Sequence, residues 1–403
     1  MTKPNILILY IDQQRFDTIA AYGNSHMITP NLDRFAASGC RFSNSYSSSP
    51  ACMPTRHDLL TGLSARHHGY WTNGKKTMSD LKDYKTTPQL LNECGYETLA
   101  IGKMHHYPAR EHHGWSSMQL MEEIPVSLEE DEYLQYLQAV GYENVMSPHG
   151  VRSLFYHSPQ AAPIREKHLG TCWVADNIIK TMREKRDKPF CIMGGWIDPH
   201  PPYSVPQKYL DMYRGAELPP PCPRPDGDSR QYPFDENNYP DKLHLQRLRE
   251  AYFAACTFVD EQIGRVLDFL ETNNMLSNTV IIFTSDHGEM LGARQAFQKF
   301  TPYEGSARVP LIISGPGFAP GSSCDVPVVS WDLTATVLDI AGAAPPPEQP
   351  YAGTSLRKIL TEQDKFANRV ICFHHGGDPD APASPFKRFV AAVGHGFKFI
   401  HYY

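Results

Sequence analysis

The sequence predicts an α/β protein of the alternating strand and helix type, with a large, mainly parallel mixed sheet flanked by helices. Short apolar runs recur along the chain without alternating polar residues, which is typical of parallel strands buried on both faces. Segments with helical periodicity separate these runs, and that alternation favours a parallel sheet. From about residue 369 onward, strand-like runs follow one another with no helix between them, which indicates a small antiparallel sheet at the C-terminus.

Each element has its own local pattern. The first strand is an uninterrupted apolar run at 5–11, and the first helix, near 29–38, has Pro30 in its first turn. Eleven of the 34 prolines lie between 199 and 240, a density that predicts a long surface segment without regular structure. The other expected elements are strands at 97–101, 190–197, 280–284, 310–313, 326–330, 369–373, 389–393 and 397–400, and helices at 176–186, 243–273 and 331–341.

Composition excludes several classes of protein. The chain has 403 residues and is 41% hydrophobic, so it can bury a large core and is not disordered as a whole. A formal charge of −6 without a block of Lys and Arg argues against nucleic-acid binding. The sequence contains no run of about eighteen apolar residues, so we expect no membrane span. Nine scattered cysteines are not the pattern of a disulfide framework.

The two ends of the sequence suggest a location and a domain division. An apolar strand follows Pro4 without a signal-peptide pattern, so we expect a cytoplasmic protein, or a periplasmic one if a signal was removed. We expect a catalytic domain at 1–365 and an antiparallel-sheet subdomain at 366–403. Because Tyr403 falls within a strand-like run and a bare edge would be exposed, whether the natural chain continues is left open.

Polar side chains follow three of the expected central strands where each strand ends. Because ligands bind beyond the carboxyl ends of the strands in open α/β sheets, we expect these side chains to lie together. They are Asp12 and Gln13, Asp198 and His200, and Asp286 and His287.

Four of these side chains form a plausible metal-binding set. Asp12, Gln13, Asp286 and His287 offer two carboxylates, an amide oxygen and an imidazole. Such a mainly oxygen set suits Ca²⁺, Mg²⁺ or Mn²⁺, and the imidazole also allows Zn²⁺.

The segment around Cys52 is the most specific one in the sequence. Cys52, Pro54 and Arg56 form the pattern C-x-P-x-R at the start of an expected helix. Taken alone, the pattern fits a buried structural cysteine or a thiolate whose pKa the helix N-terminus and Arg56 depress. A tyrosine-phosphatase loop is excluded, because it needs Arg six positions after the cysteine and position 58 is Asp.

In the segment around Cys52, the chain resembles the type I sulfatases, in which this cysteine is oxidised to formylglycine after translation. The segments 52–56 and 59–62 look like the family signature, and further motifs at 5–13, 29–33, 102–105, 198–200, 284–288 and 303–310 follow in the family's order. The resemblance covers nearly the whole chain. It implies an alkaline-phosphatase-like fold with a small C-terminal antiparallel sheet.

The resemblance also implies a role for each matching residue. The modified Cys52 would complete the metal shell, and Arg56 would hold the modified side chain. Two lysines would grip the sulfate oxygens, and two histidines would face the nucleophile and the leaving group. In this sequence the metal ligands are Asp12, Gln13, Cys52, Asp286 and His287, the lysines are Lys103 and Lys299, and the histidines are His105 and His200.

Two positions depart from many members of the family and leave the substrate open. Gln13 stands where many sulfatases have Asp, and His287 where many have Asn. This variant is similar to choline-sulfatase-like and glycan-sulfatase members and to phosphonate monoester and phosphodiester hydrolases. The resemblance implies hydrolysis of a sulfate monoester, on a sugar or another small alcohol, with phosphonate or phosphodiester hydrolysis as the alternative.

The resemblance further implies a cofactor and a partner. Ca²⁺ is the expected metal, with Mg²⁺, Mn²⁺ or Zn²⁺ as alternatives, and a formylglycine-generating or sulfatase-maturating enzyme would act on Cys52. A non-enzymatic carbohydrate-binding relative would lack a ligand or a basic group, and none is missing here. The oligomeric state does not follow from the sequence.

Overall fold

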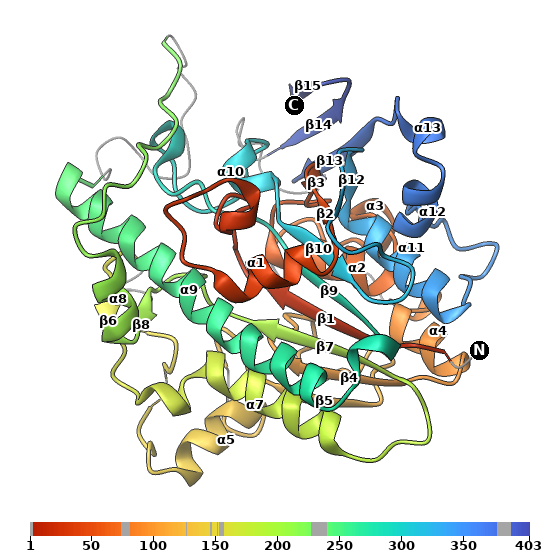
Figure 1. Cartoon of the computed structure of the whole chain (residues 1–403), viewed down its shortest axis with the longest axis horizontal. Coiled ribbons are helices and arrows are strands. Elements are labelled where there is room, and N and C mark those ends of the chain that lie inside the picture. Colours follow the sequence, from red (N-terminus) through yellow and green to blue (C-terminus); the bar gives the residue numbers. More distant parts are fainter. Residues whose placement is uncertain are drawn as a thin grey trace.

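The computed structural model describes residues 3–73, 81–125, 127–145, 147–150, 152, 157–226, 240–376 and 388–403. Its centre is an eight-stranded sheet in the order β11-β2-β10-β9-β1-β7-β4-β5 (Figure 1). The run from β9 to β5 is parallel throughout, and β10 is antiparallel to both of its neighbours. The sheet is therefore mixed and mainly parallel, as expected. Its strands are β1 (Asn5–Ile11), β2 (Cys40–Phe42), β4 (Glu97–Gly102), β5 (Ser117–Leu120), β7 (Phe190–Trp196), β9 (Thr279–Ser285), β10 (Leu311–Ser314) and β11 (Ser322–Cys324).

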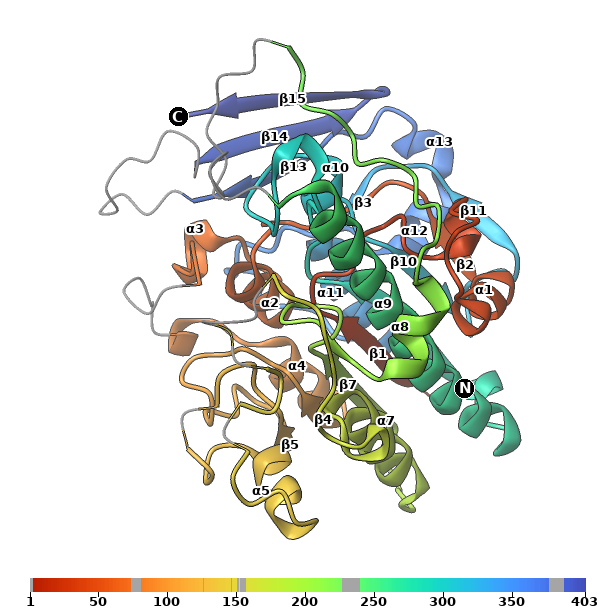
Figure 2. The same ribbon diagram turned by 90° about the vertical axis from the view of Figure 1, so that its left-hand side faces the viewer.

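Both faces of this sheet are buried under helices, which explains why the central strands are apolar throughout (Figures 1 and 2). Along β1, Leu7 and Leu9 pack into a core with residues of α7 and α9, whereas Ile6 and Ile8 pack into a second core with residues of α4, α11 and α12. The helices are α1 (Pro30–Ala37), α2 (Cys52–Thr61), α3 (Ala65–His68), α4 (Thr87–Glu93), α5 (Glu132–Ala139), α7 (Gly170–Arg183), α8 (Gln207–Tyr213), α9 (Lys242–Thr272), α10 (Glu304–Ala307), α11 (Ser330–Ala341), α12 (Leu356–Thr361) and α13 (Gln363–Phe366).

The proline-rich segment 199–240 is more regular than expected. Its described part, 199–226, contains the short strand β8 (Ser204–Val205), paired with β6 (Gln160–Ala161), and the helix α8. The expectation of no regular structure was wrong because Pro206 precedes α8, and a proline at a helix start removes no helical hydrogen bond. Residues 227–239 lie outside the described part.

The C-terminal residues form the expected antiparallel sheet, with β13 (Ile371–His375), β14 (Phe389–Gly394) and β15 (Phe397–Tyr402) in that order. Its inner face packs on Tyr46 and Val329, the latter from the short strand β12 (Val328–Val329), which pairs with β3 (Ser45–Tyr46). The division at residue 365 stays a prediction. Among the described helices none has the length and apolar character needed to cross a membrane.

Candidate active site

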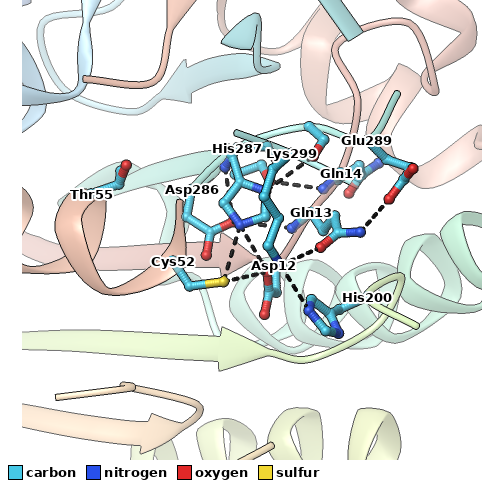
Figure 3. Close-up of polar contacts among 12 residues, drawn as sticks. Asp12, Gln13, Gln14, Cys52, Thr55, His200, Asp286, His287, Glu289 and Lys299 are labelled. Carbon is cyan, nitrogen blue, oxygen red and sulfur yellow. Dashed lines mark hydrogen bonds and ion pairs between the residues drawn. The ribbon is translucent and has the colours of Figure 1, made fainter. Parts of the chain in front are cut away.

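Three neighbouring strands deliver the predicted polar residues to one edge of the sheet. Because β9, β1 and β7 are adjacent and parallel, their carboxyl ends lie side by side. Strand β1 leads into Asp12 and Gln13, β9 leads into Asp286 and His287, and the turn after β7 carries His200. Figure 3 shows these side chains converging with Cys52 and Lys299.

Cys52 enters this group as the first residue of α2. All ten residues of α2 are buried, and the helix ends at Thr61, followed by the C-cap Gly62 with a left-handed φ of 70°. The thiol sulfur lies 3.1 Å from Nε2 of His287 and 3.8 Å from Oδ1 of Asp12. Burial and Asp12 raise the pKa of this thiol, but nearby cationic groups, Lys299 first, outweigh them and lower it to about 5. The site therefore favours the anionic form of the side chain at position 52.

The side chains of Asp12, Cys52, Asp286 and His287 could hold a metal ion together. One ligand atom from each lies within 4.8 Å of the others, and all four residues are buried. Nδ1 of His287 lies 3.0 Å from the carbonyl of Gly288 and donates to it, so Nε2 is the nitrogen that faces the group. Burial lowers the pKa of this imidazole, but the adjacent Asp286 and Cys52 outweigh burial and raise it, so Nε2 would ligate a metal after losing its proton.

The electrostatics of this group also fit a cation. Burial raises the pKa of Asp286, and the adjacent Asp12 carboxylate raises it further. Two buried carboxylates this close repel each other, and a divalent cation between them would relieve that repulsion. The donor set therefore fits a divalent metal without identifying which one.

Gln13 is held in an unusual conformation beside this group. Its φ of 64° lies in the left-handed region, which is uncommon for residues other than glycine. Its backbone N–H donates to Oδ1 of Asp286, and its side-chain oxygen accepts a 2.6 Å hydrogen bond from Nζ of Lys299. Its side-chain nitrogen donates to Oε2 of Glu289. The amide oxygen therefore faces the site, and the amide nitrogen faces away.

Arg56, one turn after Cys52 on α2, ties the helix to two strand ends. Its Nε donates to Oδ2 of Asp286 at 2.9 Å, and its Nη1 donates to the carbonyl of Lys103 at 2.8 Å. The guanidinium also lies 4.9 Å from the ring centroid of Tyr10. Nη2 of Arg56 has no hydrogen-bond partner among the described residues. The buried Arg56–Asp286 pair and the bond to Lys103 fix the position of α2 against the metal group.

Lys103 reaches the site from the end of β4. Gly102 has a φ of 91°, and a Cβ placed there would lie 2.1 Å from the carbonyl oxygen of Gly195 on β7. This close approach of β4 and β7 requires glycine. The ammonium of Lys103 forms ion pairs with Asp12 and, at 2.6 Å, with Glu123.

Lys299 and His200 form a pair opposite Cys52. Nδ1 of His200 donates to the carbonyl of Pro201, so Nε2 accepts the 2.9 Å hydrogen bond from Nζ of Lys299. Burial and the adjacent Lys299 ammonium lower the pKa of His200 well below its ordinary value. The imidazole is therefore neutral, and the proton that faces the site belongs to Lys299.

A cleft with a volume of about 610 Å³ opens onto this pair, and His105 lines it together with His200 and Lys299. Burial, followed by Lys103, lowers the pKa of His105 to about 3. Among the described residues, Nδ1 of His105 has no hydrogen-bond partner. His105 is thus a neutral imidazole with an unused nitrogen at the cleft wall. The ten residues to which the sequence assigned a catalytic or metal-binding role lie in this one region. Asp198, which was also expected here, instead accepts a hydrogen bond from Thr171 of α7.

The sequence interpretation missed four side chains of this region. Glu289 follows the Asp-His-Gly segment directly, a position that could have singled it out. Asn73 lines the cleft and accepts the backbone N–H of Met53, while Glu123 and Arg152 form an ion pair in its wall. For these three, no local pattern in the sequence marks a role.

Comparison with known proteins identifies the family. Residues 4–343 match the family model described as Sulfatase, and residues 292–403 match the model described as N-sulphoglucosamine sulphohydrolase, C-terminal. The chain therefore belongs to the sulfatases, as a type I member of the alkaline-phosphatase-like superfamily, and is a sulfuric ester hydrolase.

Individual relatives agree with this placement. The chain is 33% identical to an arylsulfatase of Clostridium perfringens, over 94% of this chain and 83% of the relative. It is 31% identical to a choline-sulfatase of Rhizobium meliloti (88% and 71%) and 26% identical to an N-acetylglucosamine-6-O-sulfatase of Bacteroides thetaiotaomicron (100% and 79%).

A solved structure confirms the fold. The phosphonate monoester hydrolase of Agrobacterium radiobacter superposes with a TM-score of 0.82 over 99% of this chain and 87% of that one, at 23% identity. At this identity the likeness establishes the alkaline-phosphatase-like fold.

Proposed function

We propose that the protein hydrolyses a sulfate monoester of a sugar or another small alcohol, with formylglycine derived from Cys52 as the nucleophile. The single observation that carries this proposal is the position of Cys52. Its sulfur lies within 4.8 Å of one ligand atom each from Asp12, Asp286 and His287, with Lys299 on the cleft side. The names of the choline-sulfatase and N-acetylglucosamine-6-O-sulfatase relatives support the two classes of alcohol.

The proposed cofactors fit the donor set. A maturation enzyme would oxidise Cys52 to formylglycine, whose hydrated aldehyde supplies a hydroxyl group for attack on sulfur. A divalent cation, Ca²⁺ as the first candidate, would stabilise negative charge on the ester oxygens and on that hydroxyl. Asp12, Gln13, Asp286 and His287 would hold the cation.

The protein's own side chains then perform three tasks. Lys103 and Lys299 place ammonium groups next to the ester oxygens, where negative charge develops. In the Lys299–His200 pair the proton is carried by Lys299, so its ammonium group can protonate the departing alcohol oxygen directly. The neutral His105 can accept the proton of the second hydroxyl group on residue 52, which releases sulfate and restores the aldehyde.

Mass spectrometry and kinetics test the proposal together. The peptide that contains Cys52 should be lighter by about 18 Da, because the thiol is exchanged for an aldehyde. The matured protein should hydrolyse an aryl sulfate, and Cys52→Ala should not. A preference for phosphorus esters of about a hundredfold, or about 2.7 kcal/mol, would refute a primary sulfatase function.

Hydrolysis of phosphonate monoesters or phosphodiesters is the second candidate. The Gln13 and His287 variant of the metal group and the fold shared with a phosphonate monoester hydrolase favour it. Rates on aryl sulfate, aryl phosphate, phosphodiester and phosphonate, measured side by side, separate the two candidates.

A further inference from the structure

The carboxylate of Glu123 lies against Lys103, one of the two lysines that the proposed function assigns to the substrate anion, and beside the neutral imidazole of His200. Its Oε2 lies 2.6 Å from Nζ of Lys103, and its Oε1 lies 3.4 Å from Nε2 of His200 and pairs with Arg152. The side chain of Glu123 is only 8% exposed. A fixed negative charge therefore belongs to the wall of the anion site.

This placement is unexpected for a site that binds an anion. Lys103 already forms an ion pair with Asp12, so its single positive charge faces two carboxylates. Arg152, which also lines the cleft, is paired with the same Glu123 carboxylate. Glu123 thus lowers the net positive charge that Lys103 and Arg152 present to a substrate by one unit.

We propose that Glu123 selects esters that carry one negative charge and rejects esters that carry two. The inference rests on the proposed function and deepens it by naming the charge class of the substrate. Sulfate monoesters, phosphonate monoesters and phosphodiesters all carry a single negative charge at neutral pH. Phosphate monoesters carry nearly two, because their second pKa is about 6. Glu123 therefore separates phosphate monoesters from all three of the other classes.

The expected size of the effect follows from Coulomb's law. Glu123, His200 and Lys299 line the same cleft, and Oε1 of Glu123 lies 3.4 Å from Nε2 of His200, which lies 2.9 Å from Nζ of Lys299. An anion bound beside His200 and Lys299 would therefore lie about 6 Å from the Glu123 carboxylate. At that distance and an effective dielectric constant of about 20, each extra negative charge on the ligand is disfavoured up to about a hundredfold. Solvent in the cleft reduces this value, so we expect a discrimination of about 10- to 100-fold.

Binding of two matched anions tests the proposal without turnover. Dimethyl phosphate carries one negative charge and methyl phosphate nearly two at pH 8, and they differ by one methyl group. Their dissociation constants would be measured by calorimetry for the wild-type holoprotein, Glu123→Gln, Glu123→Asp and Glu130→Gln. Glu130 lines the same cleft, so Glu130→Gln is a matched control for the loss of a carboxylate.

The proposal predicts a change in the ratio of the two affinities. Glu123→Gln should shift that ratio toward methyl phosphate by at least about tenfold, whereas Glu123→Asp and Glu130→Gln should leave it within about threefold. The rate ratio of aryl phosphate to aryl sulfate should rise by a similar factor in Glu123→Gln.

Three outcomes would overturn the proposal. In the first, a folded Glu123→Gln weakens both anions equally, so that Glu123 only positions Lys103. In the second, Glu130→Gln shifts the ratio as much as Glu123→Gln. In the third, which needs no variant, wild-type protein binds methyl phosphate more tightly than dimethyl phosphate. If Cys52 is unmodified or sulfate esters are not cleaved, the proposed function fails, but the binding comparison still decides the role of Glu123.

Discussion

The replacement Glu289→Gln tests whether a buried carboxylate sets the orientation of the Gln13 amide. Glu289 is 1% exposed, and its Oε1 accepts the backbone N–H groups of Leu291, at 2.9 Å, and Gln298. Its Oε2 accepts from the side-chain nitrogen of Gln13. A carboxylate can only accept hydrogen bonds, so every partner of Glu289 must be a donor. Gln13 must therefore turn its side-chain nitrogen toward Glu289.

A glutamine at position 289 would reverse this preference. Its oxygen would keep the two backbone N–H groups, so its NH₂ group would face the NH₂ group of Gln13. Two donors cannot bond to each other, and the Gln13 amide would turn over and present its nitrogen, which has no available lone pair, to a bound cation. A hydrogen bond to a charged group contributes about 1.5–3 kcal/mol. We therefore expect metal affinity to fall about 10- to 100-fold, which is typical when a residue that orients a metal ligand is lost.

Calorimetric titration of the metal-free protein with Ca²⁺ measures this effect directly. Glu304→Gln is the matched control, since its carboxylate bonds to Tyr46 and Lys398 instead of the metal group. The midpoint of thermal unfolding at saturating Ca²⁺ shows that each variant is folded. A Ca²⁺ affinity for Glu289→Gln within about twofold of the wild-type value would refute the reasoning.

Three further predictions follow from single residues. Cys52→Ala should lower kcat/KM for an aryl sulfate by at least about 1000-fold. A chelator should still lower the unfolding temperature of this variant, which would show that it is folded and binds a metal. Substantial residual activity would contradict the role of residue 52 as the nucleophile. Gly102→Ala should lower the free energy of unfolding in urea by about 2 kcal/mol or more, because its Cβ would lie 2.1 Å from a backbone oxygen at a φ of 91°. A loss under about 0.5 kcal/mol would show that β4 and β7 can separate. Burial raises the pKa of Asp260 from 3.8 to about 6, so the folded state binds this proton more tightly than the unfolded state does. The resulting stability is present below about pH 4 and is lost as the pH rises through about 6. Relative to Asp260→Asn, the free energy of unfolding of the wild type should fall by about 3 kcal/mol across this range. A difference between the two proteins that does not vary with pH would contradict this.

The strands were the most predictable part of the fold. The expected strand at 280–284 lies within β9 (Thr279–Ser285), because a run buried on both faces stands out from polar flanks. The helix expected at 176–186 begins earlier, at Gly170, where no capping side chain marks its start. The apolar run of β10 also gave no sign that this strand is antiparallel to its neighbours, since an apolar pattern is the same in both directions.

The candidate site was predictable where local order carries its chemistry. Asp12 and Asp286 directly follow apolar strands, His200 follows another a few residues later, and Cys52 lies within a specific pattern. Because parallel strands of one sheet end at the same edge, the residues that follow these strands were expected to lie close together. Glu123 was not predictable, because it reaches Lys103 across a loop and nothing in its own neighbourhood indicates that contact.

The sequence by itself determined the family, the layered fold and the chemical types gathered at the site. These depend on periodicity and on short motifs, which the local physics of strands, helices and side chains dictates. Only the tertiary structure decided how charges and amides are oriented: that Lys299 donates to His200, that Glu289 turns Gln13, and that Glu123 opposes Lys103. Such orientations depend on hydrogen bonds and Coulomb interactions that act over a few ångströms, between residues that folding alone brings together.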